Sequence, residues 1–130
     1  MSESEKEVVK KVDDVGKPPF IKEEAHVSIA TVSTMDALKF LQPLIKEVLL
    51  KNQETIVFIQ KRETRYRLYI QSDTDYIYDN GNFGFGYLGA GAHGLVDLLV
   101  SFGQYDREFL EDLVLTSVHS SNAYIEVPFS

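Results

Sequence analysis

Glycine is concentrated in one short segment of this sequence, residues 83–94, which holds five of the eight glycines in the chain. Glycine loses more conformational entropy on folding than any other residue, so this density indicates sharp turns or the close approach of another group. A helix is expected at 95–102, and the first amides of a helix attract phosphate and carboxylate groups. We therefore expect an anionic, nucleotide-like molecule to bind here. The amides would hold the anion and an aromatic ring would stack on the ligand, which assigns ligand-binding roles to Phe85, Tyr87, Gly89, Gly91, His93 and Gly94.

A basic, aromatic segment precedes the glycines. Four cationic residues fall within residues 61–67, next to tyrosines. Because side chains alternate along a strand, Arg65, Arg67 and Tyr69 are expected on one face of it. The planar fork of arginine suits phosphate, and tyrosine offers a plane for stacking on a base. We expect these three residues to complete the anion site, provided that the strand lies close to the glycine segment.

Each of the two patterns also has a purely structural interpretation. The glycines could let a helix pass close to a strand, or they could form a loop that contacts another protein. The arginines could lie on a solvated sheet face, paired with acidic residues of neighbouring strands. The sequence leaves these alternatives open.

Motifs that carry catalysis are missing. The spacing of Gly84, Gly86 and Gly89 matches G-x-G-x-x-G, but no βαβ unit surrounds it, and the Gly-Lys-Ser/Thr end of a phosphate loop is absent. The chain has no cysteine, its three histidines lack metal-ligand spacing, and no serine stands in a nucleophile elbow. We therefore expect no catalytic residue, no metal and no cofactor, which favours a binding protein over an enzyme.

One short resemblance bears on the context of this protein. Residues 86–95 resemble the G-Y-x-G-x-G-P-x-x-L segment of small uncharacterised proteins of phages and prophages, with Ala92 where proline is usual. The resemblance covers about a tenth of the chain and implies a viral accessory role rather than a particular chemistry. Some small viral proteins of similar make-up bind nucleotide signals, and this analogy agrees with a nucleotide-like ligand.

The elements that must position these residues follow from hydrophobic periodicity and turn signals. We expect an α+β fold, an antiparallel meander sheet of about five or six strands with two or three helices packed on one face. Residues 1–24 are expected to be a charged, flexible N-terminal tail, and residues 25–130 a single α+β domain. Strands are expected at 25–32, 54–60, 64–71, 76–78, 82–87 and, at the sheet edge, 123–127; helices are expected from Ser33, kinked or split at Pro43, at 95–102, and from Asp106.

Charge and composition limit the partners. The net charge is −7, and the chain after Arg67 holds one basic residue against nine acidic ones, which argues against nucleic acid. No signal peptide or membrane span is found in the sequence, so we expect a cytoplasmic protein that does not enter a membrane. The expected partner is an anionic small molecule. The alternative is a protein partner or self-association, with the chain acting as an oligomeric interaction or inhibitor protein.

Overall fold

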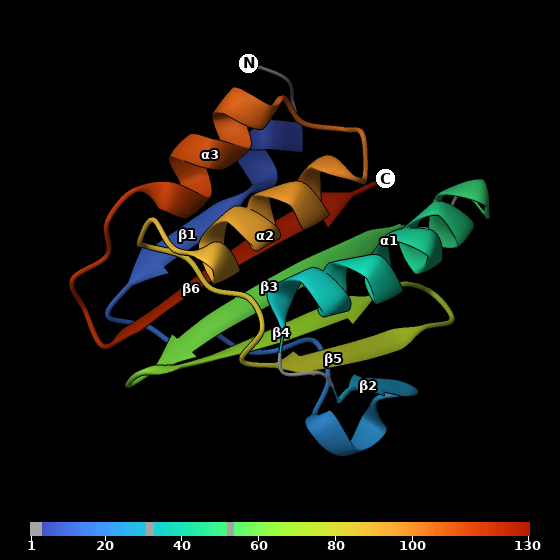
Figure 1. Ribbon diagram of the computed structural model, residues 1–130, viewed down its shortest axis with the longest axis horizontal. Coiled ribbons are helices and arrows are strands. Elements are labelled where there is room, and N and C mark those ends of the chain that lie inside the picture. Colours follow the sequence, from blue (N-terminus) through green and yellow to red (C-terminus); the bar gives the residue numbers. More distant parts are fainter. Residues whose placement is uncertain (1–3, 31–32, 52–53) are drawn as a thin grey trace.

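The computed structural model describes residues 4–30, 33–51 and 54–130, and it confirms the predicted α+β fold. A mixed sheet of six strands has the order β1-β6-β3-β4-β5-β2, and the three α-helices lie on one of its faces (Figure 1). The elements are η1 (Ser4–Glu7), β1 (Val9–Val12), η2 (Lys22–Glu24), β2 (Val27–Ile29), α1 (Thr34–Leu50), β3 (Thr55–Arg62), β4 (Arg65–Gln71), β5 (Tyr76–Asn80), α2 (Ala90–Val100), α3 (Arg107–Leu115) and β6 (Asn122–Phe129).

The sheet is antiparallel except at one end. Strands β3, β4 and β5 form three strands of the predicted meander, β6 pairs with β3, and β1 pairs with β6, all antiparallel. Strand β2 instead runs parallel to β5, as a three-residue edge strand. Among the described residues, the strand predicted from Ala25 is therefore shorter than expected, and positions 31 and 32 lie outside the described part of the chain.

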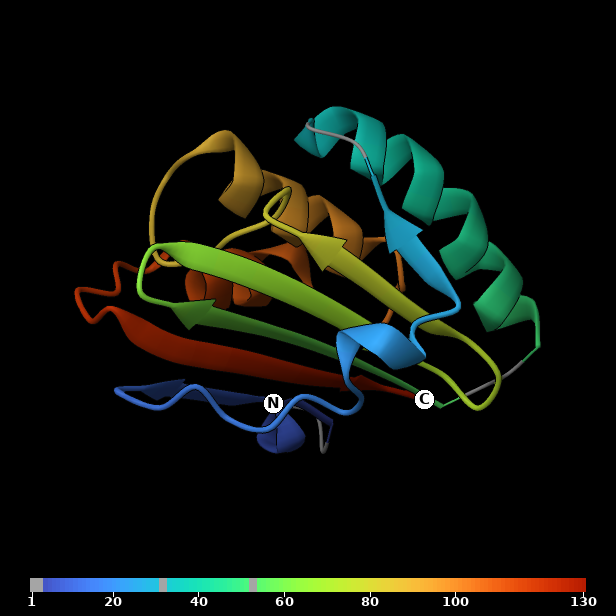
Figure 2. The same ribbon diagram turned by 90° about the horizontal axis from the view of Figure 1, so that it is seen from below.

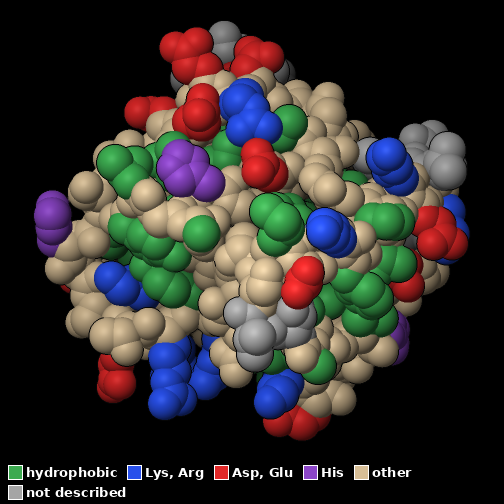
Figure 3. All heavy atoms as spheres, in the orientation of Figure 1, with side chains coloured by type: hydrophobic (Ala, Val, Ile, Leu, Met, Phe, Trp, Pro, Cys, Tyr) green, Lys and Arg blue, Asp and Glu red, His purple; other side chains and the backbone are tan. Residues whose placement is uncertain are grey.

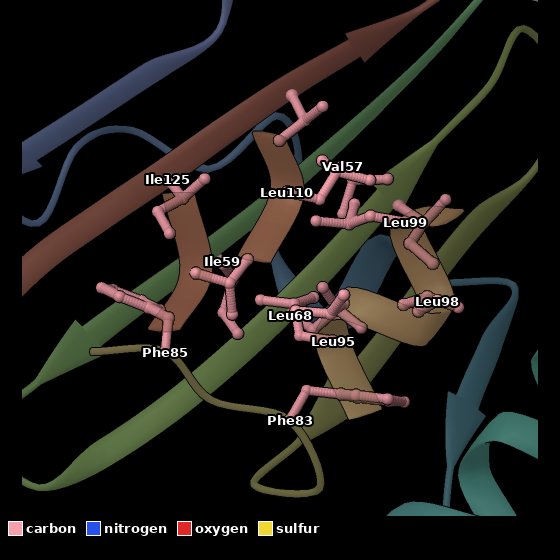
Figure 4. Close-up of a cluster of buried hydrophobic side chains, with 14 of the residues drawn as sticks. Val57, Ile59, Leu68, Phe83, Phe85, Leu95, Leu98, Leu99, Leu110 and Ile125 are labelled. Atoms are coloured by element: carbon pink, nitrogen blue, oxygen red, sulfur yellow. The ribbon is translucent and has the colours of Figure 1, made fainter. Parts of the chain in front are cut away.

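The main hydrophobic core fills the space between the sheet and the helices. Every second residue of the central strands points into it, and helices α2 and α3 close it from above (Figure 4). Phe83 and Phe85 join this core from the loop before α2 and are almost fully buried. Each such side chain stabilises the fold by about 1.5–3 kcal/mol relative to exposure.

The N-terminal segment is part of the domain, which corrects the predicted boundary at residue 24. Strand β1 pairs with β6, and the Lys10 ammonium donates a 2.6 Å hydrogen bond to the Leu113 carbonyl at the end of α3. Strand β6 consequently lies between β1 and β3 and is not the predicted edge strand. Local sequence could not reveal this, because the pairing joins residues more than a hundred positions apart.

Two further expectations about local structure are wrong. Residues 82–87 form an irregular loop rather than a strand, and α2 begins at Ala90, five residues before the predicted start at 95. At Pro43 a kink or a split was expected, and helix α1 continues through this residue as one helix, so the split does not occur. Ala37, Leu41 and Ile45 are buried on one side of α1, and this packing holds both halves of the helix against the core. No helix in the described ranges is long and apolar enough to cross a membrane.

Candidate functional site

The predicted alternation in β4 is confirmed, and it places Arg65, Arg67 and Tyr69 on the sheet face opposite the three described α-helices. We call this side the helix-free face. Leu68 and Ile70, the residues between them, belong to the main core under the helices. Figure 2 shows the helices on one side of the sheet and the segment between β1 and η2 crossing the other side. The side chains of Arg65, Arg67 and Tyr69 therefore project from the sheet toward this N-terminal segment.

A second, smaller hydrophobic cluster organises the helix-free face. It consists of Phe20, Phe58, Tyr69 and Tyr78, all at most 5% exposed. Tyr69 makes edge contacts with the rings of Phe20 at 5.3 Å, Tyr78 at 5.2 Å and Phe58 at 6.0 Å. Phe20 comes from the N-terminal segment, and its burial docks that segment on the sheet together with the 2.8 Å hydrogen bond that the Gln60 amide donates to the Val15 carbonyl.

A hollow of about 570 Å³ lies beside this cluster. This volume is within the range of small-molecule sites, about 300–1,000 Å³. The strands supply its floor and the N-terminal segment supplies part of its rim. Its polar lining residues are Lys17, Lys22, Glu23, Gln60, Arg62, Arg67, Tyr69, Tyr78 and Asn80.

A second hollow of about 490 Å³ adjoins the first. It is lined by Val15, Arg62, Glu63, Arg65, Arg67 and Asn122, so the two hollows share Val15, Arg62 and Arg67. Five cationic side chains and two carboxylates line the pair of hollows. The lining of the two hollows is therefore net positive, although the chain as a whole carries a charge of −7.

The arginines of this face have no acidic partner among the described residues. The ion pairs formed within those residues include Lys51 with Glu47 and Arg107 with Asp97, and none involves Arg62, Arg65 or Arg67. Arg62 faces Arg65 directly across β3 and β4. Like charges at such a position destabilise a sheet, so the predicted pairing with acidic residues does not explain these arginines.

The tyrosines beside the arginines remain protonated hydrogen-bond donors. Burial raises the pKa of the Tyr69 phenol, and the charge and hydrogen bond of Arg67 oppose that rise only in part. Burial also raises the pKa of Tyr78. A neutral phenol can donate its proton to an anion in the hollow, and the amide of Asn80 can do the same.

The glycine segment lies on the other side of the sheet. Gly89 is the N-cap of α2, and Gly91 and Gly94 are inside that helix. A Cβ added at Gly84, Gly89 or Gly91 would come closer than 3.0 Å to Tyr87. These glycines therefore make room for the ring of Tyr87, which supports the structural interpretation of the pattern.

The remaining glycine contacts agree with this explanation. A Cβ at Gly94 would collide with Thr34 of α1, so this glycine allows α1 and α2 to pack closely. Phe85 is fully buried, and its carbonyl accepts a 2.8 Å hydrogen bond from the Tyr66 hydroxyl. His93 is exposed on α2.

The structure thus does not bring the two halves of the predicted site together. Arg65, Arg67 and Tyr69 line the hollows of the helix-free face, whereas Phe85, Tyr87, Gly89, Gly91, His93 and Gly94 lie on the helix side and line neither hollow. Sequence reasoning missed Arg62 as a site residue, although its place opposite Arg65 follows from the short turn between them. It also missed Lys17 and Lys22, because nothing local shows that the N-terminal segment crosses the sheet.

Comparison with known proteins identifies no relative. No family model matches the chain, and no match was found among curated proteins or among solved structures. Among the described residues, no group of three His, Asp or Glu side chains could hold a metal ion. The argument about function therefore depends on the geometry of the helix-free face.

Proposed function

We propose that this chain is a non-enzymatic binding protein for an anionic, nucleotide-like small molecule, held on the helix-free face rather than at the glycine segment. The observation that carries the proposal is a group of three arginines at two adjoining hollows, Arg62, Arg65 and Arg67, which have no acidic partner within the described part of the chain. Guanidinium groups form paired, charge-assisted hydrogen bonds with phosphate and carboxylate oxygens. A ligand of this kind would relieve the repulsion between Arg62 and Arg65.

The first test is calorimetric titration of the protein with nucleoside mono-, di- and triphosphates. We expect binding that weakens as salt is added and that falls about tenfold in Arg67→Gln, since a hydrogen bond to a charged group contributes about 1.5–3 kcal/mol. Arg107→Gln is the matched control, because it removes the same charge from an exposed arginine of α3. Equal affinity in both variants, or no binding of any of these anions, would reject the proposal.

A second candidate function is protein interaction or inhibition by an oligomer. Met35 and Phe40 on α1 and Leu88 before α2 are 65%, 50% and 75% exposed. Figure 3 shows several exposed hydrophobic patches on the helix side of the molecule. Light scattering of the purified chain tests self-association, and Phe40→Ser together with Met35→Ser should abolish it if this surface is the contact. The viral accessory role is part of either proposal and derives from the resemblance of residues 86–95.

A further inference from the structure

The two hollows of the helix-free face indicate what kind of anion fits there. Arg62 and Arg67 belong to both hollows, Arg65 lines only the second, and Lys17 and Lys22 line only the first. Cationic groups therefore stand on both sides of a shared pair of arginines. An anion with a single charged group could occupy one hollow and would leave the cations of the other without a partner.

The spacing of the cations also favours an extended ligand. Arg65 and Arg67 emerge from the same strand face, and residues two apart on a strand are about 6.8 Å from each other. Arg62 and Arg65 are opposite one another, with Cβ atoms about 5 Å apart for such a pair. The three guanidinium groups are long enough to converge on one phosphoryl group, but Lys17 and Lys22 line only the first hollow and Arg65 only the second, so contact with both ends requires a short chain of phosphoryl groups.

The aromatic rings of the face offer little to a nucleobase. Tyr69 and Tyr78 are 4% and 3% exposed, and Tyr69 is surrounded by Phe20, Phe58 and Tyr78. The Lys22 ammonium lies 5.8 Å from the centre of the Tyr78 ring. Little of either ring is therefore exposed to the hollow, whereas Asn80 adds an exposed amide to the lining. Such a lining recognises phosphoryl oxygens and lacks a free plane for stacking.

From these observations we infer that the ligand is a polyanion with two or more linked phosphoryl groups, seated across Arg62 and Arg67, and that a base contributes little to its affinity. This inference rests on the proposed function and narrows it. In this arrangement one phosphoryl group of the ligand lies among Lys17, Lys22 and Asn80, and another lies beside Arg65. The N-terminal segment then belongs to the site because it supplies the two lysines.

The test compares ligands with equal phosphate number, with and without a base, at constant ionic strength. Inorganic phosphate, pyrophosphate and tripolyphosphate are titrated beside AMP, ADP and ATP. We expect affinity to rise about tenfold or more from one phosphoryl group to three, and tripolyphosphate to bind within about threefold of ATP. Affinity that depends on the base, or that is independent of phosphate number, overturns the inference while leaving the proposed function intact. Absence of binding by all six ligands rejects the proposed function itself.

Variants that touch only one hollow test the bridging geometry. Lys22→Gln and Arg65→Gln should each lower the affinity for tripolyphosphate severalfold, whereas Arg107→Gln should leave this affinity unchanged. All three residues are exposed, so melting temperatures are expected to stay close to that of the parent protein. If only one of Lys22→Gln and Arg65→Gln lowers the affinity for tripolyphosphate, the ligand occupies a single hollow and the inference is wrong. Tighter binding of a single-stranded oligonucleotide than of tripolyphosphate would also overturn it.

Discussion

The substitution Phe20→Ala tests whether Phe20 holds the N-terminal segment on the sheet. This segment supplies Lys17 and Lys22 to the proposed binding site. Phe20 is 5% exposed, stacks on Tyr76 with ring centres 4.8 Å apart, and meets Tyr69 edge-on. Removal of a buried phenylalanine side chain costs about 3–5 kcal/mol in a main core. Phe20 covers a small cluster that borders a hollow, so the lower end of this range, about 3 kcal/mol, is expected.

The measurement is urea unfolding of the parent protein and of two variants. Ile21→Ala is the matched control, because Ile21 is the next residue and is 61% exposed, so its loss should change stability by less than about 0.5 kcal/mol. Phe20→Ala should also weaken the binding of tripolyphosphate, since Lys17 and Lys22 lie on either side of residue 20 and depend on its docking. Equal stability of the two variants would refute the conclusion that Phe20 anchors the segment.

Two other consequences can be measured directly. Burial raises the pKa of Asp79, despite two hydrogen bonds from Asn82, so this carboxylate is easier to ionise in the unfolded chain. The protonated Asp79 carboxyl therefore stabilises the fold at low pH, and this contribution is lost as the pH rises from the ordinary range of an aspartate through the raised pKa. Urea unfolding between about pH 3 and pH 7 should show a larger loss of stability with rising pH in the parent protein than in Asp79→Asn. Gly94→Ala should lower the stability of the protein by about 1–3 kcal/mol in thermal unfolding, although alanine favours helices. The added methyl group would collide with Thr34, whose hydroxyl is held by its hydrogen bond to the Asn82 carbonyl. A rise in stability would show that α1 and α2 can separate.

Local patterns determined much of the fold. The alternation of residues 65–70 assigned each side chain of β4 to the correct face, because the period of a strand is independent of its neighbours. The start of α1 was also predicted, and the amide of Asp36 donates to the Ser33 hydroxyl as the capping pattern requires. The meander of β3, β4 and β5 followed from turns between adjacent strands.

Contacts between distant residues decided the rest. The position of the Tyr87 ring decides whether the glycines near the start of α2 bind a ligand or make room for this ring. Hydrophobic periodicity in the sequence does not predict that position. The candidate site exists because residues 13–24 cross the sheet, which places Lys17 and Lys22 beside Arg62 and Arg67. Periodicity reports which way a side chain points relative to its own backbone. Tertiary packing determines which other segment that side chain contacts. In this protein, packing of the N-terminal segment against β3 and β4 creates the candidate site.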